Sequence, residues 1–180
     1  MSTIYIEGRY VPAGPWAARK IERQVQHLTA DYRAGERRDV ARRLCGPDGE
    51  IAGPAAARAL LTAAIGPAVT FHRLILSPLA TGRLAGARRD DLEEWTRLVL
   101  ADLGRDLGLR LVWVAAVHGN TDTPHVHVLI GGAGEKTHWP GKGLITSVEL
   151  RRGHYRLLQA CGDARAAEIA GRLAPWPAVG

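Results

Sequence analysis

Apolar residues in this chain recur with two periods, one typical of β-strands and one typical of α-helices. The strand-like runs are short and either alternate or are rich in aliphatic residues: 2–7, 70–76, 111–117 and 126–130. The helix-like segments carry apolar residues three or four positions apart: 16–32, 54–65, 88–107 and 148–173. Strands and helices in this order predict an α+β domain, with one antiparallel β-sheet and helices packed mainly on one face.

Glycine, proline and charge indicate where these elements begin and end. Residues 88–107 form the clearest helix, because acidic residues in its first turns favour the helix dipole and Gly108 can end it. Residues 46–49 (GPDG) predict a tight turn. The Gly-rich and Pro-rich segments 8–15 and 131–134 are expected to form loops.

Three histidines fall within ten residues, between the last two predicted strands. Residues 119–124 (GNTDTP) are turn-forming types, so the flanking strands are expected to pair as an antiparallel hairpin. Alternate side chains of a strand share a face, so His125 and His127 point the same way, and His118 can meet them from the partner strand. Three neutral imidazoles without a fourth protein ligand predict an open metal site of the catalytic kind.

Composition places the chain among ordinary globular proteins. It has 180 residues, of which 46% are hydrophobic and 23% charged, which suits a single domain over residues 1–180 with an irregular tail from residue 174. No apolar run approaches the length of a membrane span, and no signal peptide is recognisable. The isolated Cys45 and Cys161 need not pair, so a cytoplasmic location is expected.

The charge of the chain favours a polyanionic partner. Its net charge is +6 and its pI about 9.9, although a coding sequence rich in G and C would also produce many arginines. The densest positive stretch comprises Arg19, Lys20, Arg23, Arg33, Arg37, Arg38, Arg42 and Arg43. Few acidic residues accompany it, so it is predicted to contact DNA phosphates, chiefly through Arg23, Arg33, Arg37 and Arg38. A solvated helix face is the alternative.

The histidine segment resembles the third motif of the relaxases, the mobilisation and conjugation proteins among the HUH endonucleases. His125-Val126-His127 reproduces the two histidines around a hydrophobic residue, and His118 stands where the family carries its third ligand. The strand ending in Leu76-Ser77-Pro78 is similar to the family's second motif. The resemblance covers residues 69–133. It implies a ferredoxin-like or RNA-recognition-like sheet with the metal on its central strands, Mn²⁺ or Mg²⁺ as that metal, and a DNA contact at Ser77.

Relaxases cut one DNA strand with a tyrosine, leaving a 5′-phosphotyrosyl link and a free 3′-hydroxyl. The resemblance implies Tyr32 as this nucleophile, since it lies upstream of the histidines at the end of a basic helix, although the family pattern would place tyrosine at Ala30. The implied partner is single-stranded DNA at an origin of transfer, with accessory DNA-binding proteins. Asn120 and Asp122 are candidates to orient the ligand imidazoles, or only shape the turn.

Several alternatives remain open at this point. Replication initiators and single-strand transposases place their tyrosine after the histidines, where this chain has Tyr155, and Tyr5 and Tyr10 are further candidates. A non-catalytic DNA-binding module would keep the fold without a nucleophile. A metal-dependent phosphohydrolase would use water and leave no protein–DNA adduct. Imidazole ligands would also suit Zn²⁺, Co²⁺ or Ni²⁺.

Overall fold

The structure, a computed structural model, describes residues 5–29, 43–78, 84, 87–118, 124–138, 141, 143 and 146–172. Its strands are β1 (Tyr5–Pro12), β2 (Leu44–Gly46), β3 (Gly49–Ile51), β4 (Val69–Ser77), β5 (Leu109–His118), β6 (His125–Lys136) and β7 (Thr146–Ser147). Its helices are α1 (Ala17–Thr29), α2 (Pro54–Ala63), α3 (Arg89–Leu107) and α4 (Arg152–Arg172). The strands form one sheet in the order β1-β4-β6-β5-β2-β3, with β7 beside β6, and every pair is antiparallel.

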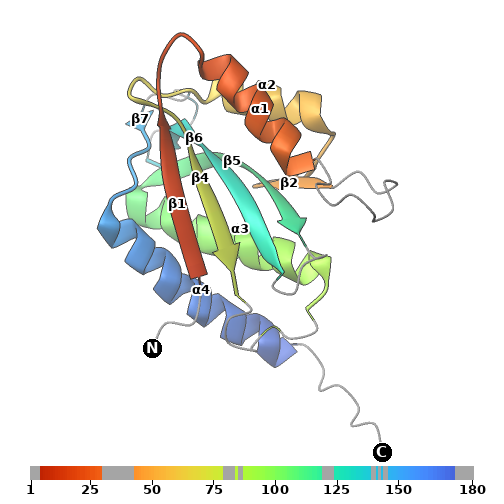
Figure 1. Cartoon of the computed structure of the whole chain (residues 1–180). Coiled ribbons are helices and arrows are strands. Elements are labelled where there is room, and N and C mark those ends of the chain that lie inside the picture. Colours follow the sequence, from red (N-terminus) through yellow and green to blue (C-terminus); the bar gives the residue numbers. More distant parts are fainter. Residues whose placement is uncertain are drawn as a thin grey trace, which may run out of the picture.

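The predicted α+β class and antiparallel sheet are confirmed, but the helices cover both faces of the sheet. Figure 1 shows α1 and α2 on one side and α3 and α4 on the other. The central strands carry apolar side chains on both sides; on β6, for example, Val128 packs with α3 and Leu129 packs with α1. Each face therefore has to be shielded from water, and the one-sided arrangement expected from the sequence is wrong.

Residues 8–12 and 131–134, which were expected to lie in loops, belong to β1 and β6, where their glycines admit close neighbours. A Cβ atom added to Gly132 would lie 1.7 Å from the backbone oxygen of Val69, so the chain after α2 crosses directly over β6 at this point. A Cβ on Gly8 would lie 2.2 Å from the ring of Tyr155. In both places glycine marks close packing within a strand rather than a turn.

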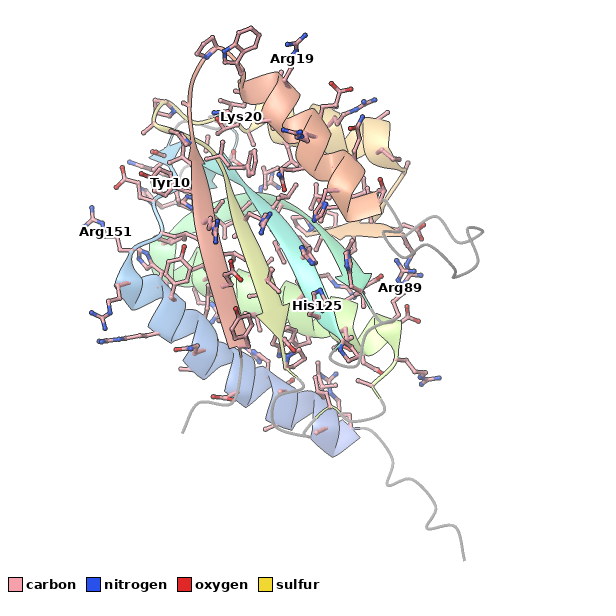
Figure 2. The ribbon with its side chains drawn as sticks, in the orientation of Figure 1. Tyr10, Arg19, Lys20, Arg89, His125 and Arg151 are labelled. Carbon is pink, nitrogen blue, oxygen red and sulfur yellow. The ribbon has the colours of Figure 1, made fainter. Side chains whose placement is uncertain are left out.

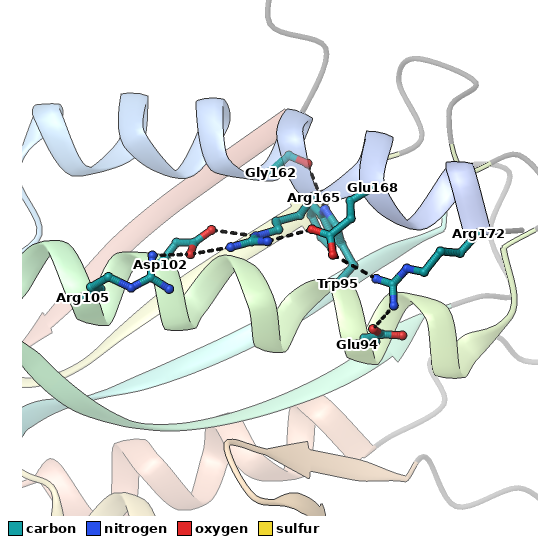
Figure 3. A network of polar contacts seen from close by, with 8 residues as sticks. All are labelled: Glu94, Trp95, Asp102, Arg105, Gly162, Arg165, Glu168 and Arg172. Carbon is teal, nitrogen blue, oxygen red and sulfur yellow. Dashed lines mark hydrogen bonds and ion pairs between the residues drawn. The ribbon is translucent and has the colours of Figure 1, made fainter.

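Polar contacts join α3 and α4, as Figure 3 shows. The guanidinium of Arg165 donates to both carboxylate oxygens of Asp102, at 2.9 and 3.0 Å. The indole of Trp95, which is fully buried, donates to the carbonyl of Gly162 at 3.0 Å. Gly162 lies within the continuous helix α4, and its carbonyl supplies the acceptor that a buried indole needs.

The Asp102–Arg165 pair gives a test of this helix packing. Asp102→Asn is expected to lower the free energy of unfolding by about 1–2 kcal/mol at neutral pH, because the amide loses charge-assisted acceptance from Arg165. Hydrogen bonding from Arg165 lowers the pKa of Asp102. The stabilisation is therefore complete above the unfolded-state pKa of about 3.9 and is lost as the pH falls through the lower folded-state value.

Urea unfolding at several pH values measures this effect. The difference between the parent and the Asp102→Asn variant should shrink as the pH falls below about 4. Asp106→Asn, at an exposed position one turn further along α3, serves as the control and should stay within about 0.5 kcal/mol of the parent. A difference for Asp102→Asn that stays constant down to strong acid would contradict the assigned ion pair.

Cys45 and Cys161 are both free thiols, as expected. Burial raises the pKa of the Cys45 thiol to about 11, which makes it a poor nucleophile. Among the described residues, no helix combines the length and apolar character needed to cross a membrane.

Candidate metal centre

The three histidines meet because β5 and β6 keep one register from Trp113 to His118. His118 lies directly opposite His125, and Ala116 lies opposite His127. Paired residues and alternate residues of a strand share a face, so all three imidazoles project from the side of the sheet that α1 covers. Leu129, two residues after His127, packs in the apolar cluster with α1, which confirms the direction. The clustering predicted from the sequence is confirmed.

The separations within the cluster fit a common metal ion. The centres of the His118 and His127 rings are 4.3 Å apart, those of His125 and His127 4.9 Å, and those of His118 and His125 5.3 Å. The Nε2 atoms of His125 and His127 are 3.0 Å apart, and one nitrogen of each ring lies within 4.8 Å of the others. Two imidazole nitrogens each about 2.1 Å from one ion would be roughly 3.0–3.4 Å apart. The residues present could therefore hold a divalent cation.

The cluster is sheltered from water on one side and open on the other. His118 and His127 are buried, whereas His125 is partly exposed. Ser77 lies beside this open side, because the hydroxyl at the end of β4 donates to the carbonyl of Pro124, 3.1 Å away, just before His125. Its predicted DNA contact stays a prediction, and in this structure the hydroxyl ties the start of β6 to β4.

A fourth histidine, His27, lies next to the cluster and was not predicted from the sequence. It is in the last turn of α1, and its ring meets that of His127 edge to face with centres 6.0 Å apart. Helix α1 therefore points its carboxyl end at the cluster. The only signal in the sequence was the position of His27 on the flank of an amphipathic helix, and that could not show which strand the helix crosses.

The tyrosines considered as nucleophiles occupy different places. Tyr32 lies outside the described residues, three positions after the end of α1. Tyr155 packs from α4 against Gly8 on the opposite side of the sheet from the histidines. Burial also raises the pKa of its phenol. Tyr5 and Tyr10 are exposed on β1. Tyr5 lies opposite Ser77 on the side of the histidines, and Tyr10 faces the other side.

The predicted DNA-contacting arginines are only partly described. Arg23 is exposed on α1, and Arg33, Arg37, Arg38 and Arg42 lie outside the described residues, as do Asn120 and Asp122. Arg43 differs from the expectation for the basic stretch, because its guanidinium is held by carboxylates of α3. It contacts Glu93 at 2.7 Å and also pairs with Asp90. A guanidinium bound in this way has little capacity left for phosphate.

Comparison with known proteins adds no relative to this description: no family model matches the chain, and no curated protein sequence is significantly similar to it. The class of protein is therefore defined by the fold and the site alone. It is an α+β protein with an antiparallel sheet, on which three histidines could hold a metal ion.

Proposed function

We propose that this protein is a metal-dependent DNA-nicking and rejoining enzyme of the relaxase type, acting in the cytoplasm on single-stranded DNA at an origin of transfer. The observation that carries the proposal is the three-histidine cluster, open at His125 and placed where α1 delivers the chain towards Tyr32. Under this proposal the ion is Mn²⁺ or Mg²⁺, while Zn²⁺, Co²⁺ and Ni²⁺ also suit imidazole ligands.

In the proposed reaction the three histidines would hold the metal ion, and Tyr32 would replace the 3′-oxygen on phosphorus. A divalent cation held by His118, His125 and His127 would polarise the scissile phosphodiester and offset the negative charge that grows on it. The Tyr32 hydroxyl gives its proton to water and forms a bond to phosphorus, and the bond from phosphorus to the 3′-oxygen breaks. The 3′-oxygen takes up a proton from water and leaves as a hydroxyl, so that one proton passes in total from the phenol to the leaving group. Reversal of these steps rejoins the strand without another energy source.

The position of α1 supports Tyr32 over Tyr155 as the nucleophile. His27, which lies beside His127, precedes Tyr32 by five residues, so Tyr32 can be no further than roughly 18 Å from it along the chain. Tyr155 is separated from the cluster by the sheet itself. Its phenol could reach the cluster only if α4 left its packing. The proposal therefore keeps Tyr32 as the nucleophile, because the packing of Tyr155 favours it over the initiator or transposase alternative.

A covalent adduct tests the proposal. The protein is incubated with single-stranded DNA carrying origin-like sequences, with Mn²⁺ or with a chelator, and the mixture is separated under denaturing conditions. We expect a DNA-bound species that resists denaturant and forms only with the metal. Nicking without an adduct would favour activated water as the nucleophile. No nicking on any strand or metal would favour a non-catalytic DNA-binding module.

A further inference from the structure

The middle of one internal strand is partly exposed to solvent on the histidine side, between the buried residues Phe71 and Ser77. β4 lies between β1 and β6, yet Arg73 and Ile75 are only partly buried. Arg73 is opposite Leu129 and Ile75 is opposite His127, so both side chains project from the face that carries the histidines. In Figure 1, the N-terminal part of β1 and the C-terminal part of β4 extend past α1. At the other ends of these strands, Val11 and Phe71 pack in the apolar cluster with α1.

The flank of α1 that borders this surface is polar and basic. Ile21 points into the core, and Glu22 pairs with Arg58 of α2 at 3.0 Å, which fixes the flank that faces α2. At 3.6 residues per turn, Lys20 and Gln24 lie on the opposite flank together with His27, whose ring reaches His127. Lys20 therefore stands beside the uncovered part of β4. Figure 2 shows it on α1, with His125 further along the same side of the sheet.

Two arginines face each other on this surface. Arg9 of β1 is directly opposite Arg73 of β4, and like charges in this position repel. Arg9 lies 3.5 Å from Glu7, whereas Arg73 has no carboxylate partner among the described residues. Glu7 also accepts from the Tyr5 hydroxyl at 3.1 Å. The single carboxylate of Glu7 thus stands against three cations, Arg9, Arg73 and Lys20, and an anion from outside would relieve the repulsion.

An exposed aromatic ring lies at the end of this surface nearest the histidines. Tyr5 is 54% exposed and lies opposite Ser77, whose hydroxyl contacts the residue before His125. We name the surface formed by Tyr5, Glu7, Arg9, Arg73, Ile75, Lys20 and Gln24 the open strip. It combines cations for phosphates, an aromatic ring for a base and an apolar floor, which are the features that bind single-stranded nucleic acid on sheets.

We infer that the open strip binds the segment of single-stranded DNA that leads into the histidine cluster, with a base stacked on Tyr5 and phosphates held by Arg73 and Lys20. This inference rests on the proposed function for the identity of the nucleic acid. Ile75 of β4 lies opposite His127, and Arg73 lies two residues, or roughly 7 Å, further along the same strand. A strand lying along the strip would therefore bring its next phosphate to the cluster.

Binding of a fluorescent oligothymidylate, followed by anisotropy in the presence of a chelator, tests the inference without requiring metal or nicking. Arg73→Gln should weaken binding by roughly tenfold and reduce the slope of log K against log salt by about 0.7. The control Arg156→Gln removes the same charge from an exposed position of α4, on the other side of the sheet, and should bind within about twofold of the parent.

Tyr5 provides a second, independent test that puts little strain on the fold. Tyr5→Ala should weaken binding by about 5- to 100-fold through the loss of stacking, and Tyr5→Phe should bind like the parent. Tyr10→Ala is the matched control, because this tyrosine is 65% exposed on the same strand but faces the other side. Parent-like binding by both Arg73→Gln and Tyr5→Ala, or no binding by the parent, would overturn the inference. If these variants still nick DNA, the proposed function stands even where the inference fails. If the parent does not nick DNA, the proposed function fails, but the binding measurements still test the inference.

Discussion

Tyr32→Phe is expected to abolish the covalent protein–DNA adduct and to reduce nicking by on the order of a thousandfold or more, since only the hydroxyl takes part in the chemistry. The ring is kept, so packing changes little. Binding of Mn²⁺ and of single-stranded DNA should remain at the parent level. Adduct formation is measured on denaturing gels, and binding is measured by calorimetry and anisotropy on the same preparations.

Tyr155→Phe is the matched control for this prediction. The phenol of Tyr155 lies on the other side of the sheet from His127, packed against Gly8, so its removal should leave nicking and adduct formation within about twofold of the parent. The reverse pattern, with an inactive Tyr155→Phe variant and an active Tyr32→Phe variant, would mean that the sheet does not separate the nucleophile from the metal. It would return the protein to the initiator or transposase type.

His125→Ala is expected to weaken Mn²⁺ binding by more than about a hundredfold. Changes to residues that merely orient a ligand already cost roughly 10- to 100-fold, so the loss of a ligand should cost more. Among the three histidines His125 is the most exposed, so its replacement leaves the smallest cavity. The thermal midpoint of the metal-free protein should therefore change little. Calorimetry of the metal-free protein with Mn²⁺ measures the affinity.

His138→Ala is the control for the metal prediction. His138 is exposed beyond the other end of β6, outside the cluster. Its replacement should leave Mn²⁺ affinity unchanged. Equal affinity of the parent and the His125→Ala variant would contradict the three-histidine site. His127→Ala should lose binding too, and its larger cavity would show as a lower thermal midpoint, because His127 is buried.

The histidine cluster could be predicted from the sequence because it depends on local geometry. His118 and His127 are nine positions apart along one hairpin, and the period of two residues in a strand fixes which side chains share a face. The end of α3 at Gly108 was predicted for the same reason, since Gly108 adopts the left-handed conformation that ends a helix. Such features need only a few neighbouring residues.

The features that were missed depend on contacts between distant segments. His27 joins the site only because α1 crosses the sheet above β6, more than ninety positions later in the chain. The arginine pair of the open strip arises from the register of β1 against β4. Gly131–Gly134 looked like a flexible loop because the sequence does not show that Val69 passes across Gly132. Long-range pairing of this kind leaves no periodic signal in a single sequence.

The most direct test of the proposed function is to identify the residue that carries the DNA. The parent protein, loaded with Mn²⁺, is reacted with single-stranded origin-like DNA, the adduct is digested with protease and nuclease, and the modified peptide is sequenced by mass spectrometry. We expect a nucleotide 5′-phosphate on Tyr32, in the segment that follows α1 and His27. A modified peptide containing Tyr155, or an adduct that forms equally well after removal of the metal, would contradict the proposed site and its chemistry.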